Sequence, residues 1–200
     1  MAMPQADDNT LMQPTTKHKL IQFPKGLDEK VVRKLSKLKG EPEWMLDIRL
    51  EAYETFMSKP MPDWGPDLSD IDFKDIKYYA TAGDQTHNWD EVPEDIRDTF
   101  DALGIPEHEK KFLAGVSTQF ESEVIYHKLQ DRYADSGIVF ESIDQGLKEY
   151  PEIYKKYFGK LIPHDDNKFA ALNTAVWSGG SFVYVPKGVK MTIPVETYFR

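Results

Sequence analysis

The sequence predicts an α+β protein in which a mainly helical region is followed by the first strands of a larger sheet. Apolar residues recur at spacings of three and four through residues 26–165, as in helices that bury one face. After Trp177 the apolar period falls to two, which is typical of a β-strand. We therefore divide the chain into a tail (1–25), a helical region (26–165) and the incomplete start of a core sheet domain (166–200).

The first 25 residues are polar and show no apolar period, so we expect a mobile tail. The helical pattern starts after Gly26, where Asp28 can cap a helix and Gly40 can end it. The residues that we expect on its buried face are Leu27, Val31, Leu35 and Leu38.

A second helix is expected to start at Pro42, a residue favoured in the first helical turn. It carries a stripe of large apolar side chains, namely Trp44, Met45, Ile48, Tyr53, Phe56 and Met57. Such a stripe usually packs into a core or docks against a neighbouring domain. A ligand-binding role for the stripe is the alternative.

Prolines and glycines then interrupt regular structure between residues 60 and 66. The next segment holds Asp70, Asp72 and Asp75, which superficially resemble a calcium loop. The glycine and the closing glutamate of that motif are absent, so we interpret these aspartates as turn-forming or capping residues.

The later helical region has one strand among its expected helices. The run IVFES at residues 138–142 is rich in strand-forming residues. Pro151 should interrupt a helix over residues 144–159, because an interior proline removes a hydrogen bond. The other helices that we expect cover residues 89–104, 106–115 and 122–137.

The last helix should be capped by Asp165, Asp166 or Asn167. In the strand that follows, Phe182 and Tyr184 share one face and Val183 and Val185 share the other, so both faces are apolar. A strand that is buried on both faces belongs inside a packed sheet. Because no further strands follow Arg200, we expect a truncated piece of a longer protein.

Composition excludes several classes of function. A net charge of −9 argues against nucleic acid as a partner, since proteins that bind phosphate backbones normally have a basic face. The absence of cysteine removes disulfides and thiolate metal sites and fits the reducing cytoplasm. No apolar run approaches the length of about 18 residues that a membrane span needs, and no secretory signal is visible.

Few residues suggest chemistry. His164, Asp165 and Asp166 form a compact cluster that could bind a metal or act in acid–base catalysis, although helix capping explains the same residues. The run WSGGSF lacks the spacing of a serine nucleophile elbow. Arg200 ends the run TYFR, where its guanidinium either faces solvent or is buried against a carboxylate.

Several long strings closely resemble the SufB group of the SufB/SufD family, whose members are scaffold subunits of SUF iron–sulfur cluster assembly. The resemblance extends from about Gly26 to Arg200. The strings that carry it include SKLKGEPEWML, DLSDIDFKDI, WDEVPEDIRDTFDALGIPEHEKKFLAGV, SEVIYH and NKFAALNTAVWSGGSFVYVPKGV.

The resemblance implies a right-handed parallel β-helix that begins near residue 168, and a non-enzymatic scaffold role. It implies SufD or a second SufB, the ATPase SufC and a sulfur donor protein as partners. The iron–sulfur cluster would be held by the full-length protein through residues beyond Arg200, so no cofactor is expected on this chain and no metal site. By the same resemblance, Arg200 could line a sulfur path or the interior of the β-helix.

An alternative function is that residues 26–165 form a docking module for the sulfur donor or a partner subunit. The acidic composition and the aromatic residues Trp44, Phe56 and Trp89 support this hypothesis, since aromatic anchors with charged rims are common at interfaces.

Overall fold

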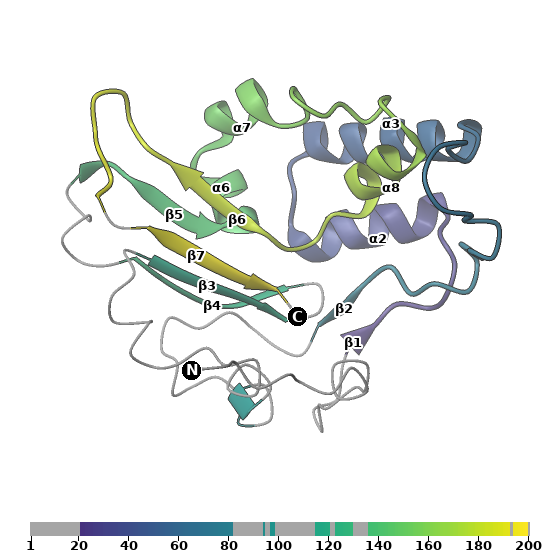
Figure 1. Cartoon of the computed structure of the whole chain (residues 1–200), viewed down its shortest axis with the longest axis horizontal. Coiled ribbons are helices and arrows are strands. Elements are labelled where there is room, and N and C mark those ends of the chain that lie inside the picture. Colours follow the sequence, from purple (N-terminus) through teal and green to yellow (C-terminus); the bar gives the residue numbers. More distant parts are fainter. Residues whose placement is uncertain are drawn as a thin grey trace. The chain divides into compact units, whose positions relative to one another are not determined.

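The structure, a computed structural model, describes residues 21–81, 94, 97–98, 115–120, 123–129, 136–192 and 194–199 (Figure 1). They fall into two compact units. The helical unit comprises residues 21–81 and 143–180, and the strand unit takes its described residues from 82–142 and 181–200. Residues 106–114 of the predicted helix at 106–115 and most of the one at 89–104 lie outside the described residues, as do residues 1–20 of the predicted tail.

The first helix, α2 (Glu29–Lys39), begins and ends where the sequence predicts. Asp28 Oδ1 accepts a hydrogen bond from the backbone N–H of Val31 at 2.8 Å, which caps the first turn. Gly40 adopts φ +61°, the left-handed conformation that ends a helix at little steric cost for glycine. Leu38 is 53% exposed, so its predicted burial is wrong. The buried face carries Val32, Leu35, Ser36 and Lys39.

The second helix, α3 (Glu43–Ser58), follows Pro42, which occupies the N-cap position. Phe56 is only 3% exposed and its ring meets that of Phe73 edge-on, with centroids 5.1 Å apart. The core interpretation of the apolar stripe is therefore confirmed at Phe56, whereas Met57 is 59% exposed.

Three further helices complete the helical unit. Helix α6 (Ile143–Glu149) and helix α7 (Pro151–Tyr157) are separated as the proline predicts. Helix α8 (Lys168–Val176) lies against α3 (Figure 1). Of the three candidate caps of α8, the structure selects Asn167, whose Oδ1 accepts the N–H of Phe169 at 2.8 Å.

The helical unit also contains a two-stranded antiparallel ribbon. Strand β1 (Ile21–Gln22) pairs with β2 (Ala80–Thr81). Next to this ribbon Phe23 packs against Tyr79, with ring centroids 5.0 Å apart. Since Phe23 is 3% exposed, ordered structure begins before the first helix.

The strand unit contains a three-stranded sheet in the order β4-β3-β7. Strand β3 (Gly115–Phe120) pairs antiparallel with β4 (Glu123–Leu129) and parallel with β7 (Val195–Phe199). The predicted helix over residues 122–137 is therefore wrong where β4 forms. The run VIYH in β4 is β-branched and aromatic, and cross-strand pairing with β3 outweighs the weak helical period.

A second, antiparallel pair joins β5 (Val139–Ser142) to β6 (Ser181–Tyr184). Both strands are confirmed predictions. Burial of β6 on both faces is not confirmed, because Val183 is 46% exposed and Val185 39%.

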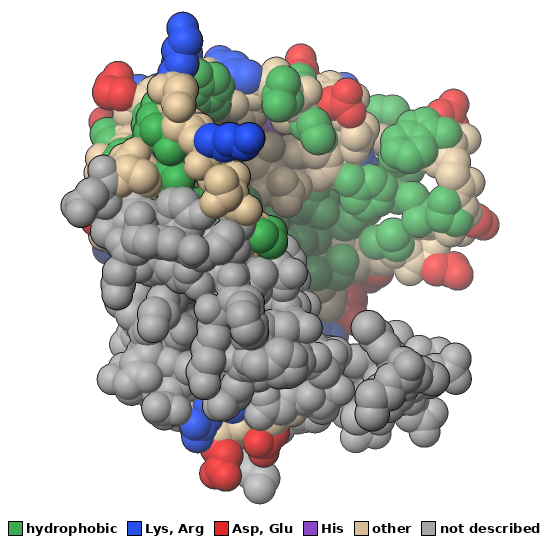
Figure 2. All heavy atoms as spheres, turned by 60° about the vertical axis from the view of Figure 1, so that its left-hand side comes forward, with side chains coloured by type: hydrophobic (Ala, Val, Ile, Leu, Met, Phe, Trp, Pro, Cys, Tyr) green, Lys and Arg blue, Asp and Glu red, His purple; other side chains and the backbone are tan. Residues whose placement is uncertain are grey.

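Hydrophobic and acidic side chains lie next to one another on the described surface (Figure 2). The loop after α3 contributes to this mixture, since Trp64 is 65% exposed, follows Asp63 directly and precedes Asp67 by three residues. This loop belongs to the helical unit.

Candidate functional site

Arg49 of α3 is a fully buried charge in the helical unit. Its side chain is 0% exposed and lies on the same face as Met45, Ala52 and Phe56. The guanidinium donates to both carboxylate oxygens of Glu41, from Nε at 2.7 Å and from Nη2 at 2.5 Å. Glu41 is itself 1% exposed, so this is a buried bidentate ion pair, the strongest geometry for such a pair.

The same guanidinium also holds the end of α8. Nη1 donates to the carbonyl oxygen of Ala175 at 3.0 Å, and Nη2 donates to that of Trp177 at 2.8 Å. The indole ring of Trp177 covers the charge, with its centroid 4.3 Å from Cζ of Arg49. A cation at this position satisfies carbonyl groups that a helix C-terminus leaves free.

Lys39, at the end of α2, is a second buried cation. Like Arg49, it contacts both a carboxylate and a backbone carbonyl. Its Nζ lies 2.7 Å from Oδ2 of Asp144 in α6 and also donates to the carbonyl oxygen of Ser178. The side chains of Lys39 and Asp144 are 3% and 22% exposed. We call Lys39, Glu41, Arg49 and Asp144 the anchor network; its two positive and two negative charges cancel.

Aromatic side chains shield the anchor network from water. Tyr154 donates its hydroxyl to the carbonyl oxygen of Ile143 at 2.7 Å and stacks on Phe158, which in turn contacts Trp177. Burial, and then the negative charges of Asp144 and Glu41, raise the pKa of the Tyr154 hydroxyl. Tyr154 is therefore a neutral hydrogen-bond donor at physiological pH.

Within the helical unit, the anchor network holds two segments that are distant in sequence, one at Asp144 and one at Trp177 and Ser178. The N–H of Ile143 donates to the carbonyl oxygen of Gly180 at 3.0 Å, so these two segments are joined directly. Ile143 directly follows Ser142, the last residue of β5, and Gly180 directly precedes Ser181, the first residue of β6. The network thus holds the backbone of the helical unit just after β5 and just before β6.

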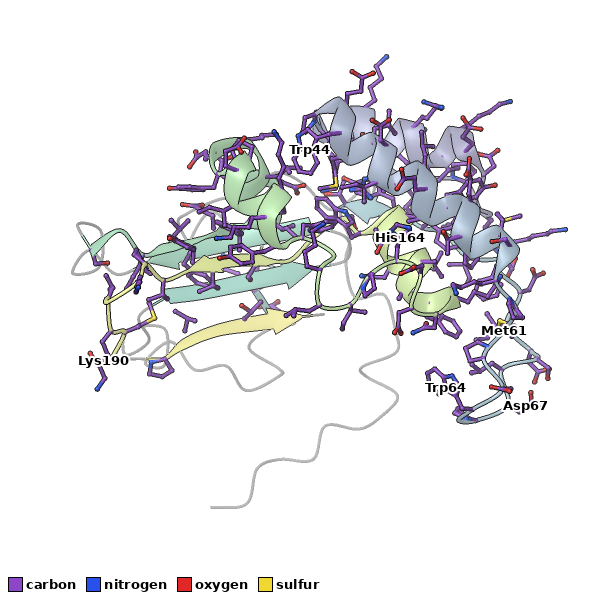
Figure 3. The ribbon with its side chains drawn as sticks, turned by 90° about the horizontal axis from the view of Figure 1, so that it is seen from above. Trp44, Met61, Trp64, Asp67, His164 and Lys190 are labelled. Atoms are coloured by element: carbon purple, nitrogen blue, oxygen red, sulfur yellow. The ribbon has the colours of Figure 1, made fainter. Side chains whose placement is uncertain are left out.

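Among the described residues, the side chains that the sequence suggested for catalysis or metal binding do not form a common site. Arg200 lies outside them. His164 is half-buried (Figure 3), and Asp166 accepts a hydrogen bond from the side chain of Asn167 at 2.7 Å. In the part of the chain that the structure describes, no three His, Asp or Glu side chains are grouped so that they could hold a metal ion.

The aspartates that resemble a calcium loop shape local structure. Asp72 Oδ1 accepts the backbone N–H of Lys74 at 2.8 Å, and Asp75 forms an exposed ion pair with Lys25 at 2.5 Å. The turn interpretation is confirmed for Asp72.

Of the predicted aromatic anchors, Phe56 is in the core and Trp89 lies outside the described residues. Trp44 is half-buried, and Lys155 lies 5.7 Å from its ring centroid. Of these three predicted anchors, only Trp44 is both described and partly exposed.

Sequence reasoning did not identify the anchor network. A signal was present, because Lys39 follows Leu35 by four residues and Arg49 follows Met45 by four, so that both charges lie on apolar helix faces. A long cation at such a position is buried only with a partner, whose identity depends on tertiary structure.

Comparison with known proteins shows which family the chain resembles. The family model for the SufBD protein N-terminal region matches residues 38–197, a range that contains the whole anchor network. None of the helices among the described residues is long and apolar enough to cross a lipid bilayer.

Individual relatives give the same result. The chain is 56% identical over 177 residues to an iron–sulfur cluster assembly SufBD family protein of Staphylococcus haemolyticus, and 55% identical over 177 residues to one of Staphylococcus aureus strain USA300. Each match covers 88% of this chain and 38% of the relative, so the chain spans well under half the length of these curated relatives. The chain belongs to the SufBD family, of which it carries the N-terminal region.

Proposed function

We propose that this chain is the N-terminal part of a SufB-type scaffold for iron–sulfur cluster assembly, and that it acts without catalysing a reaction itself. The observation that carries the proposal is the identity of 56% over 177 residues to a protein named for iron–sulfur cluster assembly. The strings found in the sequence resemble SufB and favour it over SufD. In this proposal the chain works with SufD or a second SufB, with SufC and with a sulfur donor, in the cytoplasm.

We propose that this N-terminal part has a structural role in the scaffold. The anchor network holds the carbonyl groups of Ala175, Trp177 and Ser178 directly before β6. We propose that β6 and the residues after it enter a right-handed parallel β-helix in the full-length protein. A fixed starting backbone would then set the register of its first coil.

The iron–sulfur cluster is the product that the full-length scaffold would build. Protein ligands of such clusters are mainly cysteine thiolates, and this chain contains no cysteine. The proposal therefore places cluster ligands outside these residues.

A graft tests the proposal. The corresponding region of a full-length SufB is replaced by residues 21–200 of this chain, and the same graft is made into a SufD. We expect the SufB chimera to form clusters anaerobically with SufC and the sulfur donor, and the SufD chimera to fail in its own complex. A folded SufB chimera that assembles no cluster would contradict the proposal.

Arg200 provides a second, narrower proposal, namely that its guanidinium lines a sulfur path inside the β-helix. The test is Arg200→Lys and Arg200→Leu in the full-length protein. If the proposal is correct, Lys retains part of the sulfur transfer and Leu loses it, while both variants fold. Equal transfer by the Leu variant would exclude the role.

The alternative function is a docking module for the sulfur donor or a partner subunit. The exposed apolar side chains of Tyr157, Leu161 and Ile162 favour this alternative. Purified sulfur donor and SufD are tested separately for binding to the immobilised chain; no binding of either would exclude the alternative.

A further inference from the structure

A run of basic and apolar side chains covers the end of α7 and the turn after it; we call residues 155–162 the basic segment. In this segment Leu161 is 96% exposed, Ile162 69% and Tyr157 57%. Single exposed apolar side chains are ordinary, but a contiguous group rimmed by charges is typical of an interaction site.

Aromatic packing and a left-handed glycine fix the conformation of the basic segment. Phe158 packs on Tyr154 and Trp177, with ring centroids 5.8 and 5.7 Å apart. Gly159 adopts φ +67°, and the N–H of Lys160 donates to the carbonyl oxygen of Tyr157 at 3.2 Å. The fold therefore presents the exposed apolar side chains on a structured turn.

The charge of the basic segment is opposite to that of the whole chain. Lys155, Lys156 and Lys160 occur with no acidic residue between positions 153 and 164, whereas the chain has a net charge of −9. Lys155 forms an exposed ion pair with Glu152 at 3.2 Å. Electrostatic complementarity favours a partner for this segment that offers carboxylates together with an apolar surface.

The loop after α3 offers both of these features; we call residues 61–72 the acidic loop. It contains Asp63, Asp67, Asp70 and Asp72 and no basic residue. Trp64 is 65% exposed. The loop also lines an open pocket of about 520 Å³. Figure 3 labels Met61, Trp64 and Asp67 on this loop. The lining residues include Met61, Pro62, Pro66 and Leu68.

We infer that the basic segment of one copy of this chain binds the acidic loop of a second copy. Leu161 and Ile162 enter the pocket of the acidic loop, while lysines of the basic segment pair with its aspartates. Within one copy the two surfaces do not cover each other, because both Leu161 and Trp64 remain exposed. The inference does not depend on the role in cluster assembly.

One such contact uses the basic segment of one copy and the acidic loop of the other, so the pair keeps one free surface of each kind. Two copies related by a two-fold axis can use both free surfaces and close a dimer, whereas other arrangements extend to rings or open chains. We therefore expect self-association that grows with protein concentration and weakens with salt, since exposed charge pairs are screened.

Charge reversal tests the inference. One variant combines Lys156→Glu with Lys160→Glu, and the other combines Asp63→Lys with Asp70→Lys; all four side chains are exposed. The matched control is Lys187→Glu with Lys190→Glu, two exposed lysines in the turn after β6. Sedimentation equilibrium of the 200-residue chain gives the average mass at about 0.01 M and about 1 M ionic strength.

We expect each reversed variant alone to associate at least about tenfold more weakly than the wild-type chain and the control. An equimolar mixture of the two reversed variants should associate again, because each reversed surface then finds its complement. Circular dichroism checks that all variants keep their helices.

Three results would overturn the inference. The first is a wild-type chain that stays monomeric at low ionic strength. The second is association that persists in both reversed variants, as expected for pairing through strand edges. The third is a mixture that fails to associate again, which would mean that the basic segment faces another partner. Binding of the monomeric chain to anionic lipid vesicles that is lost in the lysine variant would assign the segment to a membrane surface instead.

Discussion

At the scale of single residues, Arg49 links Glu41 to two backbone carbonyls at the end of α8. Removing one partner of a buried ion pair leaves the other charge buried and uncompensated. Arg49→Met should therefore lower the free energy of unfolding by about 3–5 kcal/mol. Urea titration followed by tryptophan fluorescence measures the loss.

The matched control for Arg49 is Arg33, which forms an exposed pair with Glu29 on α2 at 2.7 Å. Arg33→Met should cost less than about 1 kcal/mol, because exposed pairs contribute little. The double variant Arg49→Met, Glu41→Met should be more stable than Arg49→Met alone. Similar stability of Arg49→Met and Arg33→Met would show that the buried pair is unimportant.

Tyr154 gives a prediction about pH. Its hydroxyl pKa is raised by burial and by Asp144 and Glu41, whereas the unfolded chain ionises tyrosine near pH 10. Above that pH the unfolded state releases a proton that the native state retains, so stability falls as pH rises.

The Tyr154→Phe variant has no such proton, so its stability should fall less steeply above pH 10. Near neutral pH the variant should be less stable by about 1 kcal/mol, because it loses the hydrogen bond to Ile143. Unfolding measured at a series of pH values separates the two effects; equal slopes for both proteins would refute the assignment.

At the scale of elements, the N-cap residue Asn167 stabilises the first turn of α8, the helix that precedes β6. Asn167 accepts two backbone N–H groups, from Phe169 and Ala170. Asn167→Ala should cost about 1 kcal/mol, whereas Asn167→Asp should retain the cap.

Asp165 provides the control for this cap, since it is exposed and competes with Asn167 as a candidate in the sequence. Asp165→Ala should change the free energy of unfolding by less than about 0.5 kcal/mol. Thermal unfolding compares the variants. A larger cost at Asp165 than at Asn167 would place the cap elsewhere.

The elements also show what the sequence could predict. The cap at Asp28, the end at Gly40 and the break at Pro151 were predictable, because each depends on local backbone chemistry. Strand β4 was not, since its residues also fit a weak helical period and only pairing with β3 decides between the two.

The candidate site was less predictable than the fold. Arg49 and Lys39 could be marked as charges on apolar faces, but their partners Glu41 and Asp144 are set by the packing of α2, α3 and α6. The exposure of Val183 likewise depends on which elements cover the two faces of β6. The alternation of side chains along a strand shows which residues share a face, but not whether that face is covered.

At the scale of the whole molecule, the described residues fall into a helical unit and a strand unit. Because charge cancels within the anchor network, the net charge of −9 resides elsewhere on the chain.

The central claim is that this part of the SufBD family supports assembly without holding the cluster. Anaerobic reconstitution of the 200-residue chain with iron and sulfide tests it most directly. The chain has no cysteine, so after desalting we expect no visible cluster absorbance and no stoichiometric iron. A stable coloured species with stoichiometric iron and sulfide on the chain would contradict the account.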